Sequence, residues 1–435
     1  MHISIISVFP ELYDAFVKTS LIKRAQAQQI FTLSTDSFFS FVKPKERIDA
    51  PTFGPTSGML IRPEVIQKAI EDKERIHGKA FKIFFSPQGT KITQPVLHEL
   101  KEHFMQQKHI MLIPSRYEGM DARVQECYAD MVISLGDFVI MGGDLPAMVL
   151  IEGVTRLLPG VVGKQESVEK ESFTGPFVDY PEYTEPVVWN NKEVPDIIRS
   201  GNHGAIQKWR EQQAVKKTVE EHFAWLRACD VTPEQRRTVE PYIPPHYVVL
   251  MHDEIVLAED TIGTTSVTSL DIHDIARSAK TYGIKKYFIV TPLFDQQKIV
   301  QTLLDFWHTG YGISYNPQRH EAVKMVALMS SLDAVISDIE NIHGIKPIIV
   351  ATSARSEDFE RIIGYDDQAI LWTQQRPILF MFGTGKGLAS SLIKRCDYIL
   401  KPIKGFSDFN HLSVRSAVAI ILDRWLGINI KNVIK

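Results

Sequence analysis

The chain has 435 residues, of which 44% are hydrophobic and 23% charged, and its formal net charge is −3. This is the composition of a globular protein with about two or three domains, and the charge excludes a globally basic nucleic-acid binder. Three widely spaced cysteines exclude a disulfide framework and a Cys-based zinc site, and they favour a reducing cytosol. With no apolar run of about 18 residues and no basic leader, we expect neither a membrane span nor a signal peptide.

The first half alternates short apolar runs with amphipathic stretches. The runs at residues 3–8, 81–85, 109–114 and 131–134 predict buried strands, and the stretches at 65–75 and 95–107 predict helices. This alternation is typical of a parallel sheet with helices on its faces.

A polar helical segment and a proline-rich one come next. Residues 202–227 have helical periodicity, and prolines interrupt residues 232–247, so we predict a domain boundary near 240–246. Strand-like and helix-like runs then alternate again up to residue 426. The sequence therefore predicts two α/β units in series.

A charged block at residues 114–124 follows a predicted strand. It places Arg116, Glu118, Asp121 and Arg123 beside Gly119. Loops at strand carboxyl ends build ligand sites in open α/β sheets, whereas most charged loops are solvated turns with local ion pairs. Both interpretations of this block remain open from the residues alone.

A glycine-rich segment at residues 134–146 is the next candidate. Gly136, Gly142 and Gly143 would let the backbone approach a ligand closely. Tight turns before a helix capped by Asp144 would explain the same pattern. The segment contains neither a GxGxxG nor a P-loop pattern, so it is a weak signal by itself.

With their spacing intact, these two blocks resemble the bacterial tRNA (guanine-N1)-methyltransferases of the TrmD type. Residues 7–11, 86–89, 156–160, 179–184 and 200–203 match that family too, so the resemblance covers about residues 1–240. It implies a trefoil-knotted α/β fold and a cytoplasmic homodimer with its active site at the dimer interface. The implied reaction transfers methyl from S-adenosylmethionine (SAM) to N1 of guanine 37 in tRNA, just 3′ of the anticodon, with Mg²⁺ as a further implied cofactor.

The resemblance also assigns residues by matching position. The implied SAM-binding residues are Ser86, Pro87, Ser115, Gly119, Leu135, Gly136, Asp137, Phe138, Val139, Ile140, Gly143 and Pro146. The implied tRNA-binding residues are Arg116, Asp179, His203 and Arg210.

Three residues are implied for catalysis. Guanine N1 carries a proton, so a base must remove it as the methyl group arrives, and negative charge then grows on O6. Glu171 stands where the family has its aspartate base, Arg156 would face O6, and Glu118 would position the ligands.

The sequence departs from the family pattern at a few positions. Glu171 is one methylene longer than the usual base, Ser115 replaces a glycine, and Glu185 replaces an arginine. In the loop 54–58, Pro55 and Thr56 replace two glycines, and proline stiffens the loop because it fixes φ. These changes leave an alternative open, in which the first half is a weakened or inactive tRNA-binding scaffold and the second half methylates another RNA site.

The second half has its own glycine-rich loop and a polar helix start. These features resemble another SAM-dependent SPOUT RNA methyltransferase, over about residues 246–428, whose substrate the resemblance does not set. The implied SAM-binding residues are Thr352, Gly383, Gly385, Gly387, Ile403, Asn410 and Leu412. His273, Arg277 and Arg355 are candidates for RNA contact, whereas Asp271 and Asp274 are better explained as helix-start residues.

We therefore expect an α/β protein with two SPOUT-like, trefoil-knotted, parallel-sheet domains and a helical segment between them. The predicted domains are a SAM-binding domain at 1–165, a linker with a helical tRNA-binding domain at 166–240, and a second methyltransferase-like domain at 246–435. Basic clusters at 43–47, 208–210, 216–217 and 236–237 could join into a tRNA track, although a solvated helix face explains each one alone. No histidine spacing points to a metal site.

Overall fold

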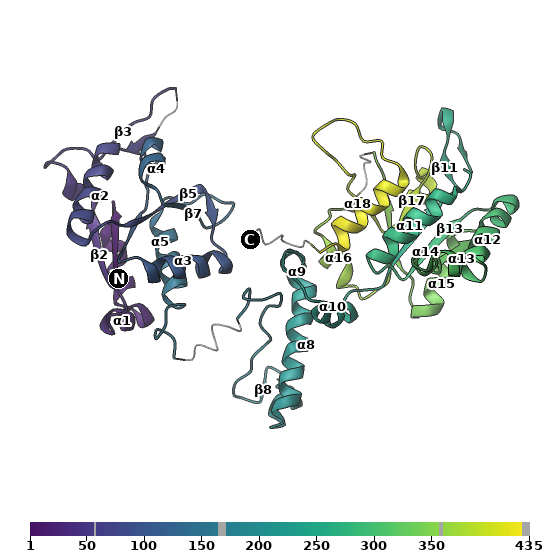
Figure 1. The fold of residues 1–435 in the computed structure, drawn as a ribbon, viewed down its shortest axis with the longest axis horizontal. Helices are drawn as coiled ribbons and strands as arrows, with labels where there is room; N and C mark the ends of the chain where they lie inside the picture. The colour runs from purple at the N-terminus through teal and green to yellow at the C-terminus, as the bar shows by residue number, and fades with distance from the viewer. Residues whose placement is uncertain (56–57, 164–170, 356–359, 429–435) are drawn as a thin grey trace. The chain divides into compact units, whose positions relative to one another are not determined.

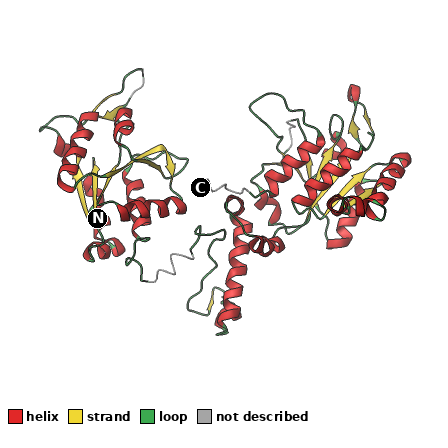
Figure 2. Cartoon of the chain, viewed as in Figure 1, coloured by secondary structure: helices red, strands yellow, loops and turns green. Residues whose placement is uncertain are grey.

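The computed structural model describes residues 1–55, 58–163, 171–355 and 360–428. The chain divides into two compact units, unit 1 (Met1–Gly175) and unit 2 (Pro176–Lys435) (Figures 1 and 2). We describe each unit by itself.

Unit 1 contains a five-stranded sheet in the order β2-β1-β6-β5-β7, in which every neighbouring pair is parallel. Its strands are β1 (His2–Ser7), β2 (Thr32–Ser37), β5 (Phe81–Lys91), β6 (His109–Ile113) and β7 (Met131–Ser134), and a separate hairpin pairs β3 (Asp49–Pro51) with β4 (Met59–Ile61). The helices are α1 (Ser20–Ala27), α2 (Pro63–His77), α3 (Gln94–Gln106), α4 (Ala122–Tyr128) and α5 (Asp144–Thr155).

Both faces of this sheet are covered by helices. Alternate strand residues point to opposite faces, so the sheet contributes to two separate hydrophobic clusters. One cluster joins the sheet to α1, α3 and α5, and the other joins it to α2 and α4. The four strands predicted in this half are all present.

Unit 2 contains a seven-stranded sheet in the order β14-β13-β10-β17-β15-β18-β16, and its pairs are again all parallel. Its strands are β10 (His246–Met251), β13 (Lys286–Val290), β14 (Val326–Met329), β15 (Ile348–Thr352), β16 (Ile362–Ile363), β17 (Ile378–Gly383) and β18 (Tyr398–Leu400). Two short hairpins pair β8 (Val188–Trp189) with β9 (Lys192–Glu193) and β11 (Ile255–Val256) with β12 (Ile262–Gly263).

The helices of unit 2 begin before its sheet. The first four are α7 (Asp196–Arg199), α8 (His203–Glu221), α9 (Phe223–Ala228) and α10 (Pro233–Val239). Those interleaved with or following the strands are α11 (Ser269–Thr281), α12 (Phe294–His308), α13 (Gly312–Tyr315), α14 (Pro317–Val323), α15 (Leu332–His343), α16 (Gln368–Trp372), α17 (Ser390–Ile393) and α18 (Val414–Leu426).

Two clusters again line the two faces of the sheet in unit 2. The larger one contains side chains of α11, α12, α14, α16 and α18 and also of α8, α9 and α10, and the smaller one contains side chains of α15 and α17. The predicted α/β class, with a parallel sheet in each half, is confirmed. Among the described residues no helix is long and apolar enough to cross a membrane.

Candidate active sites

In unit 1 the loop within β5 is pushed out of the sheet. Phe85 and Thr90 both pair with Ile133 of β7, so the four residues between them form a bulge. At Gly89 a Cβ atom would lie 2.6 Å from the carbonyl oxygen of Val132, so only glycine fits this close approach. The bulge carries the predicted SAM-binding residues Ser86 and Pro87 out of the strand ladder.

The loops that follow β6 and β7 meet beside this bulge. The Gly143 amide donates a hydrogen bond to the Ser115 carbonyl (2.8 Å), and the Ser115 hydroxyl donates to the Phe85 carbonyl (3.3 Å). A Cβ atom at Gly143 would lie 2.8 Å from Pro114 Cα, so a larger residue would force the two loops apart. The structure therefore brings three predicted SAM-binding segments together.

A buried carboxylate holds these loops in place. Asp144 accepts hydrogen bonds from Ser7 Oγ (2.5 Å), Tyr13 Oη (3.0 Å) and Arg116 Nε (2.8 Å), and it is 1% exposed. The sequence-based interpretation of Asp144 as a helix cap is wrong, because Gly143 is the N-cap of α5 and the carboxylate points into this network. Arg116, predicted to bind RNA, is the cation of the network, and its guanidinium also lies over the Phe9 ring.

The segment 137–141 exposes large apolar side chains. Phe138 is 57% exposed, Val139 83% and Met141 87%, and Leu145 and Val149 extend the exposed surface along α5. Contiguous apolar surface of this kind marks an interaction site.

The predicted base and the predicted O6 ligand contact each other directly. Arg156 Nη1 donates to Glu171 Oε2 (2.6 Å) and Arg156 Nη2 donates to Glu171 Oε1 (2.5 Å), which is the bidentate geometry favoured by guanidinium and carboxylate. Arg156 follows the last turn of α5, and the hydrogen bonds to Glu171 raise the pKa of its guanidinium. The structure thus places the two side chains together although 15 residues separate them.

Glu118 lies against the loop that contains the altered glycines. Its amide donates to the Met59 carbonyl (3.1 Å), and a Cβ atom at Gly58 would lie 2.4 Å from its Cγ. Gly54 and Gly58 both have positive φ, at 94° and 139°. Thr56 and Ser57 lie outside the described residues.

The other predicted tRNA-binding residues belong to unit 2. His203 is the first residue of α8, and the Arg210 guanidinium lies 4.7 Å from the centre of the Tyr180 ring. Asp179 is exposed just before that tyrosine. The structure places these three on or beside α8, whereas Arg116 is in unit 1.

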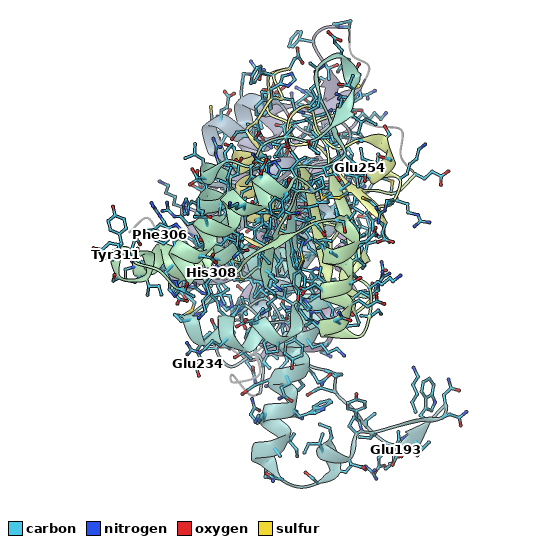
Figure 3. All side chains as sticks on the ribbon, turned by 90° about the vertical axis from the view of Figure 1, so that its right-hand side faces the viewer. Glu193, Glu234, Glu254, Phe306, His308 and Tyr311 are labelled. Carbon is cyan, nitrogen blue, oxygen red and sulfur yellow. The ribbon has the colours of Figure 1, made fainter. Side chains whose placement is uncertain are left out.

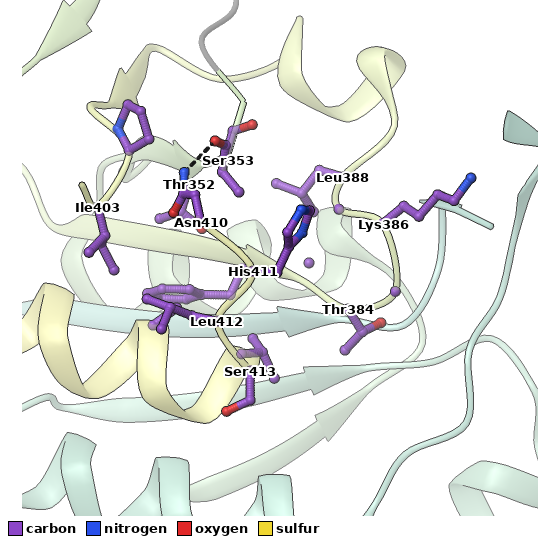
Figure 4. A pocket seen from close by; sticks show the side chains of 18 of the residues that line it. Thr352, Ser353, Thr384, Lys386, Leu388, Ile403, Asn410, His411, Leu412 and Ser413 are labelled. Carbon is purple, nitrogen blue, oxygen red and sulfur yellow. Dashed lines mark hydrogen bonds between the residues drawn. The ribbon is translucent and has the colours of Figure 1, made fainter. Parts of the chain in front are cut away.

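Unit 2 contains a pocket of about 890 Å³ near the carboxyl ends of β15 and β17 (Figure 4). This volume suits a cofactor-sized ligand. All seven residues predicted to bind SAM in this half line the pocket: Thr352, Gly383, Gly385, Gly387, Ile403, Asn410 and Leu412.

Backbone and side-chain hydrogen bonds fix the loops of this pocket. Asn410 Nδ2 donates to the Ala354 carbonyl (2.7 Å), which ties the loop before α18 to the loop after β15 (Figure 4). Thr352 Oγ1 donates to the Met381 carbonyl (3.0 Å). Gly385 and Gly387 adopt positive φ, at 55° and 106°, which exposes loop backbone to the pocket without a side chain.

Several lining residues were missed or interpreted differently from the sequence. Thr265 and Thr384 share a 2.5 Å hydrogen bond in the wall, and no motif in the sequence signals Thr265. Asp271 lines the pocket while its backbone amide is bonded to the N-cap Thr268, so the helix-start interpretation is correct but incomplete. Its carboxylate also pairs with Arg415 (3.0 Å).

Of the three candidates for RNA contact in this half, only one lines the pocket. Arg355 does so, and its Nη2 donates to the Lys386 carbonyl (3.4 Å). His273 instead packs edge-on against Trp307, with ring centres 5.3 Å apart, and burial lowers the pKa of its imidazole.

Comparison with known proteins gives two family matches. Residues 1–227 match the tRNA (guanine-1)-methyltransferase TrmD family, and residues 245–427 match a family of SAM-dependent RNA methyltransferases. A tRNA (guanine-N(1)-)-methyltransferase from Oleidesulfovibrio alaskensis is 35% identical over 98% of this chain and 99% of its own length. One from Acaryochloris marina is 37% identical over 53% of this chain and 99% of its own.

Among solved structures, a tRNA (m1G37) methyltransferase from Aquifex aeolicus is similar. It is 30% identical, the match covers 51% of this chain and 92% of that one, and the TM-score is 0.43.

Proposed function

The chain belongs to the tRNA (guanine-1)-methyltransferase family and carries a second SAM-dependent RNA methyltransferase domain, and on that premise we propose that its first site methylates N1 of guanine 37 in tRNA. The direct contact between Arg156 and Glu171 carries this proposal. The Watson–Crick edge of guanine offers an N1–H donor beside an O6 acceptor. A carboxylate beside a guanidinium is complementary to that edge, so guanine binds by separating the pair and bridging it.

Each residue then has a defined part in the reaction. Glu171 accepts the N1 proton as the new N1–carbon bond forms, and Arg156 neutralises the charge that grows on O6. Bound SAM supplies the methyl group from its sulfonium centre and leaves as S-adenosylhomocysteine. The bulge at Ser86 and Pro87 and the loops around Ser115, Gly119 and Gly143 hold the cofactor, and Glu118 positions the ligands.

A second copy of the chain completes this site in the proposal. Phe138 and Val139 belong to the segment assigned to SAM and Met141 follows it, and a partner would cover these exposed side chains. The proposed assembly is therefore a homodimer whose first active site lies at the interface between the copies.

The remaining partners follow from the tRNA substrate. Arg116, Asp179, His203 and Arg210 are the proposed tRNA contacts, and the proposed location is the cytoplasm. Mg²⁺ is the further proposed cofactor, and the described residues offer no group of three or more His, Cys, Asp or Glu side chains suited to a metal. No step assigned above depends on it.

The pocket of unit 2 is the proposed second SAM site. Its volume, the backbone without side chains at Gly385 and Gly387, and the apolar side chains at Ile403 and Leu412 suit an adenosine-bearing cofactor. With the family match of residues 245–427, this pocket supports the proposal that unit 2 carries out its own RNA methylation.

The test is single-turnover methyl transfer from labelled SAM to unmodified tRNA by the full chain. We expect Glu171→Gln to lower the rate of N1 labelling by about 10²–10⁴-fold, because the base is lost while the shape is kept. Glu171→Asp should retain part of the rate. Glu126→Gln is the matched control, because that exposed carboxylate lies on α4, across the sheet from α5. Unchanged N1 labelling in Glu171→Gln would refute the assignment. Wild-type label found only elsewhere would favour the scaffold alternative.

A further inference from the structure

The helices that the sequence assigns to the first methyltransferase pack into the core of unit 2. Val215 and Val219 of α8, Phe223 and Leu226 of α9, and Val239 of α10 belong to the same hydrophobic cluster as the sheet of unit 2. The Phe223 ring meets the Trp372 ring of α16 edge-on, with centres 4.6 Å apart. The match to the first family nevertheless ends at residue 227, within α9.

Polar contacts join the same helices to α18. Arg227 Nε donates to the Gly427 carbonyl (2.7 Å), and its Nη2 donates to the Asp423 carbonyl (3.1 Å). Both carbonyls belong to the last turn of α18 or follow it, where a cation is favourable. The Arg227 side chain is partly buried, and this burial lowers the pKa of its guanidinium.

The same helix also lines the cofactor pocket. Val414, Ala417 and Ile421 of this helix are part of the pocket wall. The helix has 13 residues, so one continuous element about 20 Å long carries both the pocket wall and the carbonyls that anchor Arg227.

The surface of these helices is suited to phosphate groups. Lys208, Lys216 and Lys217 of α8 and Arg236 and Arg237 of α10 are exposed. Among the described residues only Lys216 of these five forms an ion pair, with Glu220 at 4.0 Å. Figure 3 shows the lower part of α8 and the β8–β9 hairpin, marked by Glu193, projecting from the body of unit 2 beyond Glu234 of α10.

At the mouth of the pocket three more cationic or titratable side chains are exposed, namely Arg355, Lys386 and His411. An RNA molecule that contacts α8 and α10 and also reaches the pocket would therefore bind to unit 2 alone. We propose that the RNA substrate of the second methyltransferase is tRNA, and that α8–α10 form a tRNA-binding element shared by both reactions. This inference rests on the proposed function of the unit 2 pocket.

The test uses the full chain with Glu171→Gln, which removes labelling by the first site. It is supplied with labelled SAM and either a pool of unmodified tRNA transcripts or ribosomal RNA fragments of equal length. We expect label in tRNA at a position other than N1 of guanine 37, and at least about tenfold less in the ribosomal fragments. Label confined to ribosomal RNA, or absent from both, overturns the inference.

Adding Lys216→Gln and Lys217→Gln tests the shared element. We expect weaker tRNA binding, a fall of about 2 in the slope of log affinity against log salt, and a parallel fall in second-site labelling. The matched control is Lys280→Gln with Lys324→Gln, two exposed lysines of unit 2 that form no ion pair among the described residues. Equal loss in both double variants, or no loss in either, would refute the role of α8.

Equilibrium dialysis with SAM separates this failure from failure of the proposed function. If unit 2 binds SAM and labels ribosomal RNA, the proposed RNA methyltransferase stands and only the tRNA inference falls. If neither RNA is labelled and the pocket binds no SAM, both fall.

Discussion

The two sites differ in how much of the wall a single chain supplies. In unit 2, loops after β15, β17 and β18 enclose a pocket of about 890 Å³. In unit 1, the bulge within β5 meets the loops after β6 and β7, but Val139 and Met141 of the loop after β7 are exposed to solvent. The comparison favours the proposed second copy at the first site, whereas the pocket proposed for the second reaction is lined by residues of one chain.

The largest expected effect tests the integrity of unit 2. Phe223→Ala should lower its free energy of unfolding by about 3–5 kcal/mol, since the ring is buried against Trp372. All six tryptophans lie in unit 2, so tryptophan fluorescence during urea unfolding reports this unit alone. Phe294→Ala is the control, because that ring is 76% exposed. Equal midpoints for the two variants would mean that α9 does not belong to this core.

Arg156→Ala should separate the two sites by activity. We expect the rate of N1 methylation to fall by about 10²–10³-fold, because the growing charge on O6 loses its donor. SAM binding to the unit 2 pocket should be unchanged. Radiolabelled single-turnover assays and dialysis measure the two effects. Loss of SAM binding in unit 2 as well would show that the sites are not independent.

Val139→Asp tests the need for a second copy. Burying an unpaired carboxylate costs at least about 2 kcal/mol, so the dimer dissociation constant should rise at least about thirtyfold. Sedimentation equilibrium measures it, and N1 methylation should fall with the dimer fraction. Met105→Asp is the control, at an exposed apolar position on α3. A monomeric wild type that methylates N1 at full rate would contradict the proposal.

Asn410→Ala tests the pocket of unit 2 instead of the first site. Losing the bond to the Ala354 carbonyl removes about 1 kcal/mol of loop anchoring, so SAM affinity at this pocket should fall about fivefold. N1 methylation should keep its wild-type rate. Calorimetric titration of SAM into the full chain resolves the weakened site, and unaltered affinity would show that the anchor does not shape the pocket.

The smallest expected effect is a pH dependence of unit 2. His246 Nε2 accepts a hydrogen bond from Trp425 Nε1 (3.0 Å), and His246 Nδ1 donates one to the Pro244 carbonyl (2.6 Å). Burial lowers the pKa of His246 from 6.5 to about 4. As the pH falls, this imidazole is therefore protonated in the unfolded chain before it is protonated in the folded one. Stability is therefore lost as pH falls from about 6.5 towards 4, and this residue contributes about 0.7 kcal/mol between pH 7 and 6.

Urea unfolding at the two pH values measures this effect. His246→Phe should lose that part of the pH dependence, although it leaves Trp425 without its acceptor and is less stable at both values. A variant with the same pH dependence as the wild type would mean that other groups cause it.

Much of both folds could be predicted from the sequence because periodicity and turn residues are local. Four of the five strands in the sheet of unit 1 follow from their apolar runs, whereas the polar strand β2 was not predicted. The residues predicted for the second cofactor site line one pocket. The partner of an apolar face is not a local property. Val219 and Phe223 have the same helical pattern whichever unit they contact, so their packing against unit 2 needed the structure.

Buried polar contacts were harder still to predict. Asp144 at a helix start is a good cap by every local rule, yet Ser7, Tyr13 and Arg116 bind its carboxylate across more than 25 residues of sequence. The resemblance implied that Arg156 and Glu171 act in the same reaction, but it did not predict that the two side chains contact each other.

The packing of Phe223 and Leu226 against unit 2 also bears on how such a two-domain chain can arise or be divided by mutation. A stop codon near residue 240 would leave these side chains facing water, since their neighbours Trp372 and Trp425 would be absent. Polar residues at these positions, or another surface to cover them, would then be needed. Joining the two domains in one gene and separating them again would therefore each require compensating substitutions along α8 and α9.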